Sequence, residues 1–109
     1  SGGEAQRLKI ATELKNEGNI YIMDEPTTGL HLSDIDNFYR IVKRLVDKNN
    51  TVIIIEHNLD IIKYADWVID MGPEGGKAGG ELLFEGLPED LVKCERSHTG
   101  RHLGMLLEE

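Results

Sequence analysis

The chain opens with a helical pattern that is followed by a strand pattern. A helix is predicted over residues 1–16, because apolar residues recur there at helical spacing and Gly18 offers a C-terminal stop. The next apolar run, residues 20–23, is continuous and ends in Asp-Glu-Pro, which predicts a strand buried on both faces of a parallel, helix-covered sheet. The residues that set the helical spacing are Ala5, Leu8, Ala11 and Leu14.

A second helix and a second strand follow. Ser33 is predicted to cap the helix, whose apolar residues fall on one face and whose basic residues lie near its C-terminal end. Residues 51–55 form a β-branched run, so the order strand, helix, strand predicts a right-handed crossover between parallel strands. The apolar face of the second helix comprises Ile35, Phe38, Ile41, Val42 and Leu45.

The second half of the chain has shorter elements. We expect a short helix at residues 59–64, strands at 67–71 and 81–85 around the glycine-rich turn 72–80, and a short helix opened by Pro88. The pattern weakens from Cys94 onward, so a tail after about residue 95 is expected to be either helical or flexible. Together these elements predict an α/β fold with a mainly parallel sheet and flanking helices.

Composition and charge limit the classes of function. The 109 residues are 39% apolar and 29% charged, which allows one modest core. The formal net charge is −8 without a lysine and arginine stripe, so this segment is not expected to bind nucleic acid by itself. The single cysteine excludes an internal disulfide, and the lack of a membrane-length apolar run or signal peptide predicts a cytoplasmic setting. Because the chain starts inside a motif and without Met, we expect it to be a piece of something longer.

Two acidic residues directly follow the first predicted strand. Asp24 and Glu25 stand at the carboxyl end of a parallel strand, where α/β sheets place their ligands. Asp24 would hold Mg²⁺, usually through water, and Glu25 would orient or polarise a water that attacks a γ-phosphate. The alternative is that Asp-Glu-Pro merely ends a strand.

Two further elements are compatible with phosphate binding. Ser1 and Glu4 have the spacing of a capping box, and Gly2 and Gly3 expose backbone N–H groups at a helix N-terminus, where an anion can bind. A plain helix start is the alternative, and both interpretations can hold together. His57 follows the second predicted strand, so it would lie at the same sheet edge as the acidic pair and donate a hydrogen bond to a terminal phosphate. A structural or solvated histidine is the alternative there.

In order and spacing, these elements resemble those of ABC-type ATPases. Residues 1–7, Ser-Gly-Gly-Glu-Ala-Gln-Arg, are similar to the ABC signature, residues 20–25 to a Walker B strand, and His57 to the switch histidine. The sequence Asp-Glu-Pro-Thr-Thr-Gly-Leu-His at residues 24–31 differs from the Ser-Ala-Leu-Asp type of transporters and resembles the UvrA family, which recognises DNA damage in bacterial nucleotide excision repair. Segments 55–60, 65–76 and 99–101 also resemble the C-terminal end of that family, so the resemblance runs from Ser1 to about Leu103.

The resemblance implies that residues 1–109 are the C-terminal portion of one ABC-type nucleotide-binding domain, lacking the phosphate-loop strand. It implies ATP and Mg²⁺ as cofactors of a longer protein, with Asp24 as the metal ligand and Glu25 and His57 as catalytic residues. The signature would contact the γ-phosphate held by the opposite nucleotide-binding domain, and the loop up to Leu30 would line the space between the two sites. The nucleotide-contacting residues implied in this way are Ser1, Gly2, Gly3, Glu4, Gln6, Asp24, Thr28 and Gly29.

The resemblance also implies the partners. These are the opposite nucleotide-binding domain and a second copy of the subunit, together with damaged DNA and a UvrB-like partner that would bind through other regions; no membrane is involved. The zinc modules of the family would lie outside this segment, in which histidines and Cys94 show no metal-ligand spacing.

The sequence departs from the family pattern in having no Gly-x-x-x-x-Gly-Lys-Ser/Thr loop. Residues 72–78 are a decoy, because the outer glycines are one residue too close and Ala78 offers no hydroxyl to Mg²⁺; we interpret them as a turn with Lys77 solvated. The chain alone is therefore expected to be inactive. Two alternatives remain for the longer protein: another ABC ATPase, of the transporter or chromosome-maintenance type, or a non-hydrolysing ABC scaffold.

Overall fold

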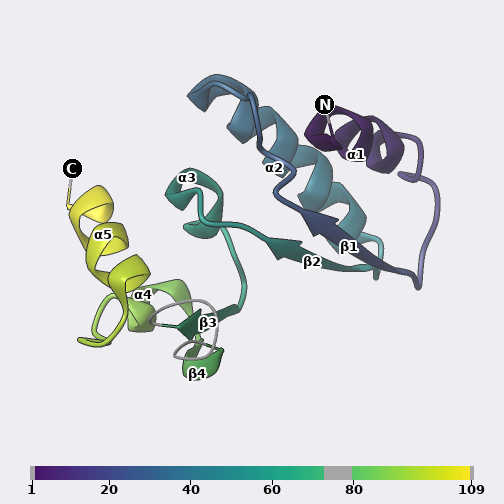
Figure 1. The fold of residues 1–109 in the computed structure, drawn as a ribbon. Helices are drawn as coiled ribbons and strands as arrows, with labels where there is room; N and C mark the ends of the chain where they lie inside the picture. Colours follow the sequence, from purple (N-terminus) through teal and green to yellow (C-terminus); the bar gives the residue numbers. More distant parts are fainter. Residues whose placement is uncertain (1, 73–79, 109) are drawn as a thin grey trace. The chain divides into compact units, whose positions relative to one another are not determined.

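The computed structural model describes residues 2–72 and 80–108 (Figure 1). The chain divides after Ile61 into two compact units. The first unit contains α1 (Gly2–Ala11), β1 (Ile20–Asp24), α2 (Leu32–Asp47), β2 (Thr51–Ile55) and most of α3 (Leu59–Ile62). The second contains β3 (Val68–Gly72), β4 (Glu81–Gly86), α4 (Pro88–Leu91) and α5 (His98–Leu107). No helix in these described parts is long and apolar enough to cross a bilayer.

The first unit is built on a parallel pair of strands. β1 and β2 pair in register from Ile20 opposite Thr51 to Asp24 opposite Ile55, and α2 connects them and packs against β2. The predicted strand, helix, strand order and the α/β class are therefore confirmed. The apolar face of α2 is confirmed as well, and the buried core of the unit, each residue at most 7% exposed, consists of Ile10, Met23, Ile35, Phe38, Val42, Leu45 and Ile61.

Asn50 sets the register of this pair from its amino end. Its buried side-chain amide donates to the carbonyl oxygens of Asn16 and Leu45 at 2.9 and 2.8 Å, and its Oδ1 accepts from the N–H of Asn19 at 3.0 Å. The preceding Asn49 takes a left-handed conformation with φ 68°, which asparagine tolerates better than most residues. These bonds end α2 and align the starts of both strands, so that their carboxyl ends meet at one edge.

The first helix differs from its prediction in length and in the face it buries. α1 is shorter than expected and ends at Ala11; it buries Gly3 and Ile10, while Leu8 on the predicted apolar face is 69% exposed. A Cβ on Gly3 would lie 3.3 Å from the carbonyl oxygen of Pro26. The predicted face is wrong because this close approach orients the helix.

Smaller differences concern the ends of elements. α2 begins at Leu32 with His31 at its N-cap, and no side-chain cap bond forms there, so the predicted cap at Ser33 is wrong. α3 ends at Ile62, two residues before the predicted end at 64, whereas β3 and β4 lie within one residue of their predictions. The cap at Ser1 and the turn and solvated lysine predicted within 73–79 lie outside the described residues.

Burial of β1 on both faces is not found. Ile20 and Ile22 on one face are each 68% exposed, whereas Met23 on the other face is 2% exposed. On β2, Ile53 and Ile55 are exposed as well. The prediction is wrong for this chain because its own helices cover only the face that carries Met23.

The second unit is antiparallel, so the expectation of a mainly parallel sheet fails beyond residue 67. β3 and β4 pair antiparallel, with an irregularity between Asp70 and Met71. The helix predicted to start at Pro88 is confirmed as α4, and the tail contains α5. α4 packs against β4 and α5, around the buried Leu91 and Leu103.

Ser97 joins α5 to β3, and its replacement tests this junction. Its fully buried hydroxyl donates to the Asp70 carboxylate and accepts from the N–H of Gly100 at 2.8 Å. We expect Ser97→Ala to lower the free energy of unfolding by about 1–3 kcal/mol, because a helix N–H and a carboxylate lose their partner. Denaturant unfolding measures the loss. Ser33→Ala, at an exposed serine, is the control, and equal losses for both variants would contradict the assignment.

Candidate functional site

The chain leaves β1 through a strained residue, Glu25. The N–H of Glu25 donates to the carbonyl oxygen of Ile55 at 2.8 Å, so the ladder continues one residue past β1. Glu25 then has φ 49°, in the left-handed region that residues other than glycine occupy at a cost of about 1–3 kcal/mol. Such strain persists where surrounding contacts enforce it, and it is concentrated at functional sites.

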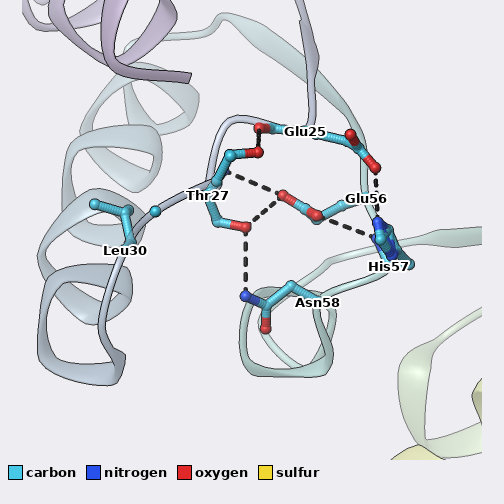
Figure 2. Close-up of a pocket in the computed structure, with 8 residues that line it drawn as sticks. Glu25, Thr27, Leu30, Glu56, His57 and Asn58 are labelled. Atoms are coloured by element: carbon cyan, nitrogen blue, oxygen red, sulfur yellow. Dashed lines mark hydrogen bonds and ion pairs between the residues drawn. The ribbon is translucent and has the colours of Figure 1, made fainter. Parts of the chain in front are cut away.

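The side chain of Glu25 meets His57 across the two strand ends. Glu25 Oε1 lies 2.6 Å from His57 Nε2 (Figure 2). The side chains are 52% and 79% exposed, and an exposed pair of this kind contributes only about 0–1 kcal/mol. A ligand can therefore separate or bridge the two groups easily. The structure thus brings together the two residues for which the sequence suggested catalytic roles.

A polar network lies next to this pair, and sequence reasoning missed it. Thr27, 4% exposed, donates to Glu56 Oε2 through its N–H at 3.2 Å and through its hydroxyl at 2.6 Å. Glu56 Oε1 accepts the N–H of His57 at 3.2 Å, and Asn58 Nδ2 donates to the Thr27 hydroxyl at 3.4 Å (Figure 2). The available signal was a charged residue, Glu56, between an apolar strand and the candidate histidine.

The start of α1 holds the end of β1. The side-chain amide of Gln6 donates to the carbonyl oxygen of Asp24 and accepts from its N–H, both at 2.7 Å. Arg7 Nη1 donates to the carbonyl oxygens of Pro26 at 2.5 Å and Thr28 at 3.1 Å. Gln6 thus supports the strand that carries the acidic pair, and Arg7 holds the loop that follows.

An open depression of about 390 Å³ lies over this loop. Its volume falls within the range of small-molecule sites, about 300–1,000 Å³. Carboxylates, a hydroxyl and an imidazole reach it, so it can orient a water and donate a hydrogen bond to an anion. The lining residues, none from α1 among those described, are Glu25, Thr27, Thr28, Gly29, Leu30, Glu56, His57 and Asn58.

Asp24 is the candidate metal ligand, and its surroundings fit a partly hydrated magnesium ion. Its exposed carboxylate has no hydrogen-bond partner among residues 2–72 and 80–108, and these residues contain no cluster of three or more His, Cys, Asp or Glu side chains suited to a metal. Mg²⁺ commonly binds one or two carboxylates, with waters and substrate phosphates completing its shell. A single free carboxylate is compatible with that arrangement and with a nucleotide supplying the other oxygens.

The remaining predicted residues lie around the start of α1 and in the loop after β1. Gly2 is exposed with open space around the position of a Cβ, and Glu4 is exposed, whereas Gly3 is buried; Ser1 lies outside the described residues. In the loop, the hydroxyl of Thr28 donates to the carbonyl oxygen of Glu25 at 2.9 Å. Gly29, the next residue, has φ 81° and is exposed.

Comparison with known proteins identifies the family. No family model matches the chain. It is 54% identical to UvrABC system protein A of Escherichia coli strain K12 over 110 aligned residues, and 55% identical to that of Vibrio vulnificus strain YJ016 over 111. These alignments cover 98% and 99% of this chain and 12% of each relative. The crystal structure of UvrA2 from Deinococcus radiodurans matches with a TM-score of 0.91 and 44% identity over 98% of this chain and 14% of that one. The chain therefore belongs to the UvrA family, whose members it matches along one small segment of their length.

Proposed function

We propose that this chain is part of an ATP-hydrolysing subunit that recognises damaged DNA in bacterial nucleotide excision repair, within the cytoplasm. The observation that carries the proposal is the contact of Glu25 with His57 at the carboxyl edge of a parallel strand pair, in a UvrA-type sequence. In this proposal the chain is the C-terminal portion of an ABC-type nucleotide-binding domain without its phosphate-loop strand. The similarity to UvrA proteins argues for this function over that of a transporter.

Two side chains would act on the terminal phosphate. Phosphoryl transfer depends on positioning and on electrostatic stabilisation, so the protein has to orient a water and hold the γ-phosphate. The Glu25 carboxylate would accept a hydrogen bond from the attacking water. His57 would exchange its bond to Glu25 for one to a phosphate oxygen, which the exposure of both side chains permits. Asp24 would hold Mg²⁺ through water, and the ion would neutralise charge on the phosphates.

The start of α1 would act on the nucleotide of the opposite domain. The exposed Gly2 and Glu4 begin a helix whose N–H groups and partial positive charge suit an anion. The buried Gly3 would let this helix start approach the loop after β1. Ser1 would complete the same signature. Gln6 would support it indirectly, because its amide already binds the backbone of β1.

The loop after β1 would lie between the two nucleotide sites. Thr28, Gly29 and Leu30 line the open depression and would face the opposite nucleotide-binding domain. A second copy of the subunit, a UvrB-like partner and damaged DNA would bind through other regions of the longer protein. The net charge of −8 supports this division, since it does not favour contact of this segment with DNA phosphates.

The chain by itself is expected to hydrolyse no ATP. Carboxylates and a histidine cannot position a triphosphate without the backbone nest of a phosphate-binding loop, and the sequence contains none. A phosphate-release assay on the purified chain with ATP and Mg²⁺ measures this. The control is the chain with Glu25→Gln, because sustained release that disappears in this variant would contradict the prediction.

A further inference from the structure

Glu56 makes hydrogen bonds to both segments that carry the proposed catalytic residues. Its Oε2 accepts the N–H and the hydroxyl of Thr27, two residues after Glu25, at 3.2 and 2.6 Å. Its Oε1 accepts the N–H of His57 at 3.2 Å (Figure 2). One carboxylate therefore holds both the segment that follows Glu25 and the backbone of His57, which are the two segments whose side chains meet.

The bonds to Thr27 matter because Glu25 is strained. A residue other than glycine keeps a φ of 49° only where the flanking segment is held in place. Arg7 holds this segment through two carbonyl oxygens, those of Pro26 and Thr28. Glu56 holds the intervening Thr27 through its two donors, and at 4% exposure Thr27 has little access to water as a replacement acceptor.

Glu56 is poorly suited to act on the nucleotide itself. Both of its oxygens already accept hydrogen bonds from the protein, three in all. The Glu25 carboxylate, in contrast, contacts the exposed His57 through Oε1 and belongs to a side chain that is 52% exposed, so it remains accessible to water. This difference separates a group that positions the loop from a group that meets the substrate.

We propose that Glu56 is a positioning residue, which binds Thr27 and the backbone of His57 and so keeps Glu25 in its left-handed conformation within reach of the imidazole. The inference rests on the proposed function, because it gives Glu56 a role in hydrolysis that acts through Glu25 and His57. It predicts that changes at Glu56 affect the rate of hydrolysis more than the binding of nucleotide.

The test uses a full-length UvrA protein that carries this segment, with Glu56→Gln. Glutamine has the same length but only one acceptor oxygen, so it cannot serve Thr27 and His57 together. We expect kcat for ATP hydrolysis to fall about tenfold while the Kd for ATP stays within about threefold, because a misplaced group slows the reaction without removing binding contacts. Glu17→Gln, at an exposed loop glutamate, is the control and leaves both quantities unchanged.

Variants of Thr27 test the same contact from the other side. Thr27→Val removes the hydroxyl and is expected to reduce kcat, whereas Thr27→Ser keeps it and preserves most of the rate. Combined with Glu56→Gln, the Thr27→Val change is expected to add less than its separate effect, because both remove one interaction.

The outcomes separate this inference from the proposed function. If Glu25→Gln abolishes turnover in the same protein and Glu56→Gln leaves it unchanged, only the role of Glu56 is refuted. If Glu25→Gln leaves turnover unchanged, the catalytic role that the proposed function gives to Glu25 fails, and the inference fails with it. Equal loss of ATP affinity and turnover in Glu56→Gln, or full additivity with Thr27→Val, would show that Glu56 does not act by positioning Glu25.

Discussion

Replacing Glu25 by glutamine in a full-length UvrA protein is expected to slow ATP hydrolysis by about 10²- to 10⁴-fold while ATP still binds. Glutamine preserves the size of the side chain and removes the charge that polarises the attacking water. The side chain of Glu25 is 52% exposed and contacts the exposed imidazole of His57, so the change disturbs little packing. Steady-state turnover and ATP affinity, measured on the same preparation, give the two quantities.

Asp24→Asn is the matched comparison for this variant. If Asp24 holds Mg²⁺, losing its charge weakens Mg²⁺-dependent binding of ATP, whereas losing the charge of Glu25 leaves binding intact. The two adjacent carboxylates are thereby distinguished: Asp24→Asn weakens the affinity for ATP, whereas Glu25→Gln lowers the rate of hydrolysis. A rate for Glu25→Gln within a few-fold of the unsubstituted protein would refute the catalytic role of Glu25.

The parallel pair and its connecting helix could be predicted because local patterns determine them. Continuous apolar runs at residues 20–23 and 51–55 locate the strands, and the one-sided pattern from Ile35 to Leu45 locates the buried face of α2. What covers each strand face is not a local property. The sequence of β1 suggests burial on both faces, but within this chain Ile20 and Ile22 are exposed.

The orientation of α1 could not be predicted for a different reason. Its alanines and leucines indicate one face, yet the helix is positioned by the close approach of Gly3 to Pro26 and by the hydrogen bonds of Gln6 and Arg7 to the end of β1 and the loop beyond it. These contacts join residues far apart in the chain, so helical periodicity cannot predict them.

The part of the candidate site that lies directly after the two strands could be predicted from the sequence. Polar residues after parallel strands lie at one sheet edge, which brings Glu25 to His57. The conformation of Glu25 was not predictable, because a residue before proline is expected to be extended, and here it is left-handed. The network of Glu56 and Thr27 depends on side-chain contacts between strands and becomes visible only in three dimensions.

Gly2 offers the most direct test of whether the start of α1 acts on a nucleotide held by another domain. Gly2 is exposed, and a Cβ added there meets nothing within 4 Å among the described residues. Gly2→Asp is therefore expected to fold, and an acidic residue in the first turn stabilises a helix by about 0.3–1 kcal/mol. Gly3 is unsuitable for the same test, because a Cβ there would lie 2.8 Å from Arg7 Nη1.

In a full-length UvrA protein whose other composite site is silenced, we expect Gly2→Asp to reduce ATP turnover about 100-fold or more, since a carboxylate would stand where the γ-phosphate has to approach the helix N-terminus. Binding of ATP to the phosphate-binding loop of the mutated domain is expected to remain near normal. That loop is separate from the signature, which the same domain would present to the nucleotide of the opposite domain. Gly2→Ala, which adds a methyl group and no charge, is the control and is expected to lose much less activity. If α1 merely begins with a helix cap, Gly2→Asp retains turnover, and the action on the opposite domain is refuted. Equal loss of binding and turnover would point instead to misfolding of the variant.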